Sequence, residues 1–351
     1  MVPAILRALA ASVRRDLNTY GALKTNNFFL FVGLLIWGNL ASGVKPVSAE
    51  PFLVLLGVLM LFPVSSDPLD KIPAARLALW PHSAPQRAAL RLASLAFSPI
   101  LWLAVVLLSL RGSLSLAVLF IGASIAIQAG GVLVARGPAW SAARIVPQVP
   151  GRLGGLVSAN VREMLTLLDP YLALAISAGG TAWRIVGHRG VNADPGAFPI
   201  LSMLVAVAMS TYAQCLFALE TGSGMTRYRL LPLRGWEVLW AKDLAFVGVL
   251  LLLVLPLDPA AGLAFGFAAL AIGRYPTLKI QLPQRRWRLT SGRVPYGVMQ
   301  GLVGSTLGFH ASGGGLAIAI AMYGVALYLG GRAWDRQASR AAIPRAQAQA
   351  A

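Results

Sequence analysis

The side chains best suited to chemical recognition are concentrated in one stretch of the chain, residues 227–245. This stretch holds four basic residues, two Trp and one Pro in nineteen positions, and it lies between two long apolar runs. Basic residues beside an apolar run attract anionic headgroups, and Trp accumulates at the membrane surface. The pattern therefore predicts charge recognition at a membrane surface rather than the making or breaking of bonds.

Residue patterns for covalent or metal chemistry are missing from the sequence. There is no Gly-x-x-x-x-Gly-Lys-Ser/Thr phosphate loop, so the chain cannot hydrolyse ATP by that route. There is no His-Glu-x-x-His pattern, and the three His residues are far apart in the sequence. The single Cys, Cys215, cannot form an internal disulfide or a metal cage. We therefore expect no catalytic residues, no metal, no cofactor and no enzymatic activity of the chain by itself.

Composition assigns the chain to the membrane proteins. Hydrophobic residues make up 57% and charged residues only 12% of the 351 residues, whereas soluble domains are about one quarter charged. Several apolar runs reach or approach the roughly 20 residues that cross a bilayer as a helix. The sequence predicts an all-α polytopic membrane protein with about ten transmembrane helices.

The elements that would position the basic stretch follow from the apolar pattern. Residues 5–26 and 156–168 have apolar positions every three or four residues, which predicts helices lying in the membrane interface. The alternative for the first of them is a frayed cytoplasmic tail. The predicted spans cover residues 28–43, 52–64, 92–110, 114–135, 170–186, 198–219, 244–257, 260–272, 296–309 and 315–331.

Polar residues inside these spans are few. No acidic residue lies in the middle of a predicted span, and the polar exceptions are Gln128 and Gln214, which we expect to bond a neighbouring helix. Acidic groups within the membrane are typical of ion or proton coupling. Their absence from the predicted spans disfavours an ion-driven transporter.

An internal repeat relates the basic stretch to a weaker copy at residues 76–94, which lies 151 residues earlier. Arg76 aligns with Arg227, Pro81 with Pro232, Gln86 with Glu237 and Arg91 with Lys242; Arg87 adds a further basic residue to the first copy. Ser83 and Gln86 also form the spacing of a capping box, which predicts a helix start. We therefore divide the chain into a first transmembrane half (1–154), a second half (155–335) and a disordered tail (336–351), with basic hinges at 67–91 and 220–243.

The distribution of Lys and Arg predicts the topology. On one side of the predicted membrane lie 26 of the 30 basic residues, and the other side holds Lys45, Arg111, Arg184 and Arg189. The positive-inside rule then places both termini and both hinges in the cytoplasm of a cell with an inner membrane. Because topology and attraction to anionic lipids account for the net charge of +18, we expect no binding to nucleic acid.

The second hinge resembles the region between the second and third spans of ABC exporter permeases of the drug and polysaccharide exporter class. The resemblance rests on Glu220 and Gly224, the basic Leu-rich stretch 227–231, the turn at Pro232, and the Lys-Asp-Leu-Ala ending at 242–245. Residues 161–170 look like the elbow helix of that class. The resemblance covers 155–331 well and 5–135 more loosely, and its motifs are degenerate.

The resemblance implies a permease subunit that couples a separate ABC ATPase to substrate movement, with the hinge as the coupling helix. In that reading outward-facing basic side chains pair with acidic groups of the ATPase, and Trp side chains anchor the helix. The implied coupling residues are Arg227, Arg229, Pro232, Arg234, Trp236, Glu237, Trp240 and Lys242, and those of the first copy are Arg76, Pro81, Gln86, Arg87 and Arg91.

The chain departs from the usual pattern of six spans and one coupling segment, because its first half has four predicted spans and its second half has six. Even span counts give both halves the same orientation, so the repeat is parallel. We therefore expect one chain to bind two ATPase copies. The alternatives are an ATPase-independent carrier or membrane scaffold, and a basic interfacial loop in place of a coupling helix. The sequence does not indicate a substrate class.

Overall fold

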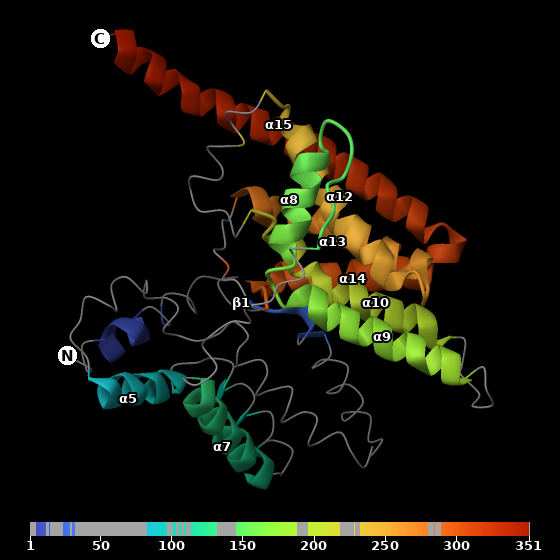
Figure 1. Cartoon of the computed structure of the whole chain (residues 1–351). Coiled ribbons are helices and arrows are strands. Elements are labelled where there is room, and N and C mark those ends of the chain that lie inside the picture. The colour runs from blue at the N-terminus through green and yellow to red at the C-terminus, as the bar shows by residue number, and fades with distance from the viewer. Residues whose placement is uncertain are drawn as a thin grey trace. The chain divides into compact units, whose positions relative to one another are not determined.

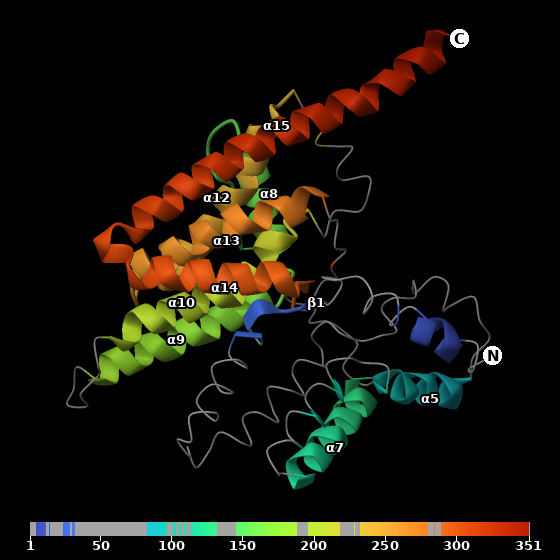
Figure 2. The same cartoon turned by 180° about the vertical axis from the view of Figure 1, so that it is seen from behind.

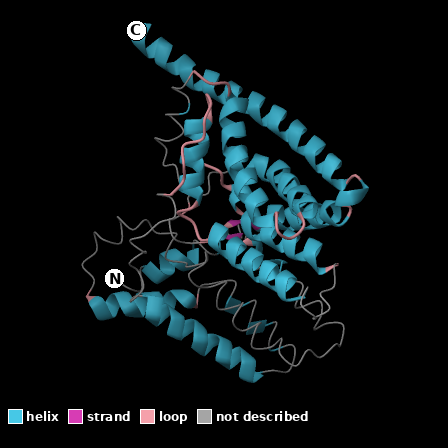
Figure 3. Cartoon of the chain, turned by 45° about the vertical axis from the view of Figure 1, so that its right-hand side comes forward, coloured by secondary structure: helices cyan, strands magenta, loops and turns pink. Residues whose placement is uncertain are grey.

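The computed structural model describes residues 5–11, 14, 24–28, 30–31, 83–96, 101–102, 105–106, 109, 114–131, 145–187, 196–217, 228, 232–279, 284 and 289–350. The described residues are mostly helical (Figure 3). They belong to two compact units, residues 1–139 and 140–351. The predictions for residues 32–82, which include the second span and most of the first hinge, lie outside the described residues.

The second unit is a bundle of long helices. Its elements are α8 (Gly154–Met164), α9 (Asp169–Gly187), α10 (Ala197–Ser210), η3 (Tyr212–Gln214), α12 (Gly235–Val254), α13 (Pro259–Lys279), β2 (Gly292–Arg293), α14 (Val294–Phe309), η4 (Ala311–Gly313) and α15 (Gly315–Ala350). Figures 1 and 2 show α9, α10 and α14 side by side. Helix α13 is central, since it contacts α10, α12, α14 and α15.

Small residues allow the helices around α13 to approach closely. A Cβ atom on Gly262 would meet the side chains of Ser202 and Val254, and one on Gly266 would meet Leu250. The Gly262-x-x-x-Gly266 pair of α13 therefore packs within this unit, which is the close approach that such a motif allows. Phe265, between the two glycines, is fully buried.

The first unit is described in part. Its elements are the two-residue strand β1 (Lys24–Thr25), α5 (Ala84–Leu95) and α7 (Leu114–Gly131). The helix expected over residues 5–26 is helical at 5–11, where Ile5 and Leu9 are buried, but β1 occupies its end. The side chain of Asn26 accepts a hydrogen bond from the backbone N–H of Phe28 at 3.0 Å, a local bond that competes with a continuous helix.

Each of the six apolar runs predicted as spans in the second half contains a helix, but in the run 198–219 α10 ends at Ser210 and η3 at Gln214, and residues 218–219 lie outside the described residues. Two helical segments, Ala197–Gln214 and Gly315–Gln337, are long and apolar enough to cross a membrane by length and composition within the described part of the chain. Two other predicted ends differ from the structure. The span predicted at 260–272 is shorter than its helix, because α13 continues to Lys279. Helix α15 continues to Ala350 through the segment assigned to a disordered tail, which is rich in the helix formers Ala, Arg and Gln.

Candidate functional site

The two copies of the repeat start a helix at the same aligned position. Helix α5 begins at Ala84 and α12 begins at Gly235, and the 151-residue offset pairs these two residues. In α5 the predicted capping box is present: Gln86 N–H donates to the Ser83 hydroxyl at 3.4 Å, and Ser83 N–H donates to the Gln86 side chain at 3.1 Å. The prediction of a helix start at Ser83 is therefore confirmed.

The aligned start of α12 keeps only half of this capping arrangement. Glu237, which aligns with Gln86, accepts a hydrogen bond from the backbone N–H of Arg234 at 2.7 Å. The side chain of Arg234 carries only donors, so it cannot replace the Ser83 hydroxyl as an acceptor. Instead, Gly235 N–H donates to the carboxylate of Asp335 in α15 at 2.8 Å. Asp335 and Glu237 place negative charge where the helix dipole favours it, so the start of α12 is fixed to α15.

Close packing reinforces this connection between α12 and α15. A Cβ atom on Gly235 would lie 2.7 Å from the ring of Trp334, and one on Gly331 would lie 2.8 Å from the Cβ of Trp236. Atoms at such distances overlap, so glycine at both positions lets the helices touch. The beginning of α12 therefore has little freedom to move without α15.

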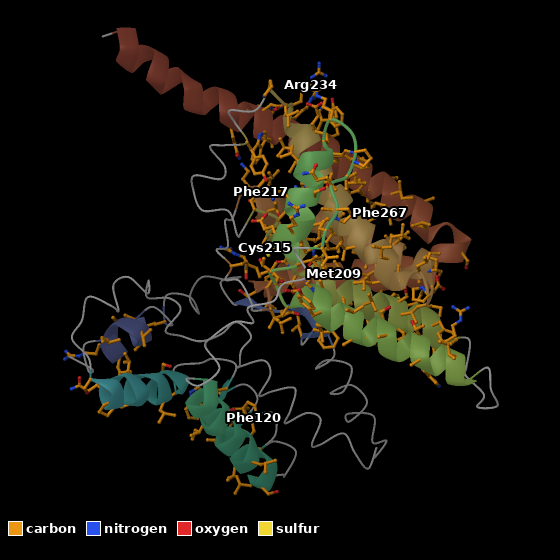
Figure 4. All side chains as sticks on the ribbon, in the orientation of Figure 1. Phe120, Met209, Cys215, Phe217, Arg234 and Phe267 are labelled. Atoms are coloured by element: carbon orange, nitrogen blue, oxygen red, sulfur yellow. The ribbon has the colours of Figure 1, made fainter. Side chains whose placement is uncertain are left out.

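The outward side of this helix start carries a basic and aromatic surface. Pro232 and Arg234 are exposed, as are Trp236 (44%) and Trp240 (37%). Figure 4 shows Arg234 at one end of the unit, with its side chain directed away from the helices. These four predicted coupling residues are thus accessible together. We call them the outer surface of α12.

Glu237 faces inward, unlike these four residues. Besides accepting from Arg234, its carboxylate lies 3.5 Å from a guanidinium nitrogen of Arg152, just before α8. Another guanidinium nitrogen of Arg152 donates to the carbonyl oxygen of Pro232 at 3.5 Å. Glu237 therefore bonds to Arg234 and Arg152 from the buried side of the segment. Arg152, which lies outside the predicted motif, adds a further basic group beside the exposed surface.

The expectation that Lys242 faces outward, as a coupling residue, is wrong. Its side chain is 1% exposed. The ammonium group donates to Asn160 Oδ1 at 2.9 Å and lies 3.6 Å from a carboxylate oxygen of Glu163, both in α8. It also lies 4.7 Å above the ring of Phe217. A buried ammonium group needs such partners, and they come from segments distant in the sequence, so the residues around Lys242 alone could not indicate its burial.

Asp243, the next residue, forms a second buried network on another side of α12. Its carboxylate oxygen Oδ2 accepts from Arg274 of α13 at 2.5 Å and from the hydroxyl of Tyr323 of α15 at 2.8 Å. Asp243 is 0% exposed, Arg274 4% and Tyr323 4%. Consecutive residues on a helix point about 100° apart. Lys242 therefore connects α12 to α8, whereas Asp243 connects it to α13 and α15.

Helix α8 packs along the same part of α12. Val157 forms a buried apolar cluster with Ala241 and Ala245, against which Val161 also packs. The buried residues of α8 include Val157 and Met164 from its predicted apolar face. Asn160 lies on the same buried side and was missed as a candidate, although its position one turn from Val157 and Met164 was a usable signal. The contact between the predicted elbow helix and the predicted coupling helix thus combines apolar packing with the bonds of Lys242.

Several predicted site residues cannot be placed in this arrangement. Arg227, Arg229, Arg76 and Pro81 lie outside the described residues. Gln86 completes the cap of α5; Arg87 and Arg91 lie within α5. The predicted residues that the structure brings together are those from Pro232 to Lys242.

Gln214 behaves as predicted for a polar residue in an apolar run. Its amide donates to Gln300 Oε1 of α14 at 2.8 Å, and its own oxygen accepts from the backbone N–H of Arg293. Gln300 in turn donates to the carbonyl oxygen of Ala269 in α13 at 2.8 Å. The two glutamines are fully buried and satisfy each other, so they join helices rather than form an open polar site.

The arrangement combines an exposed basic and aromatic surface with buried ionic bonds between helices. In the described part of the chain, no group of three or more His, Cys, Asp or Glu residues could hold a metal ion. The exposed end of α12 presents guanidinium and indole groups, and its buried side holds two ionic networks. Searches matched the chain to no family model, no curated protein and no solved structure.

Proposed function

We propose that the chain is the permease subunit of an ATP-driven ABC exporter and that the outer surface of α12 docks on a separate ATPase. The observation that carries the proposal is the form of α12: the exposed outer surface at its start is followed within one turn by the buried Lys242 and Asp243, which bond it to α8, α13 and α15. A displacement of the exposed start would therefore act on these three helices. The sequence has no phosphate loop, and in this proposal a partner supplies the energy of ATP.

The membrane arrangement expected from the sequence fits a subunit of this kind. The chain is a multi-pass protein of a bacterial inner membrane with about ten spans, both termini cytoplasmic and anionic lipids around its basic ends. Two ATPase copies bind one chain, one at α12 and one at the segment around α5. The shared register of the two helix starts supports this pairing, and the resemblance supports the class of partner.

Reversing the charge of the docking surface is expected to uncouple the ATPase. In the triple variant Arg227→Glu, Arg229→Glu, Arg234→Glu, carboxylates would face the acidic groups expected on the partner, and like charges at an interface cost several kcal/mol. We expect ATP hydrolysis stimulated by the chain to fall at least tenfold, measured as phosphate release by the complex in lipid nanodiscs. The purified variant should keep the thermal stability of the wild type.

A matched control reverses three charges on the predicted opposite side of the membrane. The variant Lys45→Glu, Arg111→Glu, Arg189→Glu is expected to keep stimulation within twofold of the wild type. Equal stimulation by the first triple variant and the wild type would contradict the proposal. Full function with no ATPase bound would favour a carrier or scaffold instead.

A further inference from the structure

The contact between Asp243 and Arg274 makes fewer hydrogen bonds than its groups allow. Of the two carboxylate oxygens only Oδ2 is used, and it accepts from both Arg274 Nη2 and Tyr323. Among the described residues, Oδ1 of Asp243 and both Nε and Nη1 of Arg274 are buried without a hydrogen-bond partner. Buried polar groups are normally paired, so three unpaired atoms on two facing residues mark this contact as incomplete.

A second arrangement of the same two groups would satisfy more of these atoms. Arginine and carboxylate groups commonly pair through two parallel N–H to O bonds. In that geometry Oδ1 would accept from Nε or Nη1 while Oδ2 keeps a bond to the guanidinium. A small shift or rotation of α12 against α13 would bring the two groups into this geometry, because the two residues lie on different helices.

The contact between Asp243 and Arg274 lies at the turn of α12 that is also bonded to α8 and α15. Asp243 follows directly on Lys242, whose bonds to Asn160 and Glu163 tie the same turn of α12 to α8. Tyr323 ties it to α15, the helix that also caps the start of α12 through Asp335. A displacement of the exposed end of α12 would therefore be transmitted along the helix to Asp243, where α12 is bonded to α8, α13 and α15.

We propose that Asp243 and Arg274 form a two-position contact, with one hydrogen bond between them in this conformation and two in another, and that the change sets the position of α12 against α13. This inference rests on the proposed function, since the ATPase supplies the displacement. Asp243 and Arg274 are positioning residues in this scheme: they touch neither nucleotide nor substrate. The two positions correspond to two states of the helix bundle.

The variant Arg274→Lys tests the inference, because lysine keeps the positive charge and can form the single bond but not the parallel pair. We expect the variant to assemble with the ATPase and to keep the KM for ATP, while the stimulated kcat falls at least fivefold in phosphatidylethanolamine and phosphatidylglycerol nanodiscs. A merely structural role would lower assembly or thermal stability and leave kcat per assembled complex unchanged.

Two further variants provide a control and a second test. Thr277→Val, one turn along α13, removes a different buried hydrogen bond, from the Thr277 hydroxyl to the carbonyl oxygen of Ala213; its stimulated kcat should stay within twofold of the wild type. Asp243→Glu keeps both oxygens but displaces them by one methylene, and we expect at least a threefold fall in stimulated kcat. This variant decides the question if Arg274→Lys fails to assemble.

The outcomes separate the inference from the proposed function. Stimulated kcat within twofold of the wild type in both Arg274→Lys and Asp243→Glu would overturn the two-position contact and leave the proposed function standing. The same result in Asp243→Glu alone would overturn it when Arg274→Lys does not assemble. If the wild-type chain neither binds nor stimulates an ATPase, the proposed function fails and the inference falls with it.

Discussion

Replacing Asp243 by Ala is expected to lower the free energy of unfolding of the purified chain by about 3–5 kcal/mol. The substitution removes the carboxylate that faces Arg274 and leaves a guanidinium group that is 4% exposed without its counter-charge. It also removes the acceptor of the Tyr323 hydroxyl. The measurement is reversible unfolding in mixed mild detergent and dodecyl sulfate, followed by circular dichroism.

The double variant Asp243→Leu, Arg274→Met supplies the control for this prediction. Because both charges are removed and apolar side chains of similar size take their place, the double variant should recover most of the stability that Asp243→Ala loses. A loss below about 1 kcal/mol for Asp243→Ala, within the range of ordinary surface substitutions, would contradict the buried ion pair. A double variant no more stable than Asp243→Ala would show that apolar packing cannot replace the pair.

Replacing Lys242 by Glu is expected to destabilise the chain by a similar amount, about 3–5 kcal/mol. The new carboxylate would be buried beside Glu163, where the ammonium group now lies 3.6 Å from that side chain. It would also face the oxygen of Asn160, which accepts from Lys242 at present. The site is 1% exposed. Water therefore cannot solvate the two like charges or the two facing acceptors. Thermal unfolding and gel filtration in detergent measure the effect.

Arg234→Glu is the matched comparison, since it makes the same charge reversal on the same segment at an exposed position. We expect the stability of this variant to stay within about 0.5 kcal/mol of the wild type. Lys242→Met, which keeps the unbranched stem, should cost about 1–3 kcal/mol through the unpaired Asn160 oxygen. If Lys242→Glu were as stable as Arg234→Glu, Lys242 would be an outward residue, as the basic pattern alone suggested.

Features that depend on neighbouring residues were predictable from the sequence. The helix start at Ser83 follows from the Ser and Gln spacing, and the alignment of the repeat places the start of α12 at Gly235. Each of the six apolar runs of the second half contains a helix, because the apolar content and length that predict a span also favour a long helix. The bond from Gln214 to Gln300 follows the rule that a polar side chain in an apolar run finds a partner.

Features that depend on distant residues were not predictable in this way. Lys242 and Asp243 occur in a segment that reads as polar and outward, and only partners from α8, α13 and α15 make their burial tolerable. Arg274 follows the predicted span 260–272, and its counter-charge lies 31 residues earlier, in α12. The orientation of Glu237 toward Arg152 likewise depends on the segment that precedes α8. Periodicity contains no information about such pairings.

Native mass spectrometry of the affinity-purified complex shows whether this chain works with a separate ATPase, as we propose. The tagged chain would be purified in mild detergent from the cells in which it occurs, and its partners identified from their peptides. We expect a complex of one 37.0 kDa chain with two copies of a phosphate-loop ATPase. Two copies of this chain in the complex would contradict the pairing of both repeats with ATPases. A fully functional chain that carries no ATPase would contradict the claim itself.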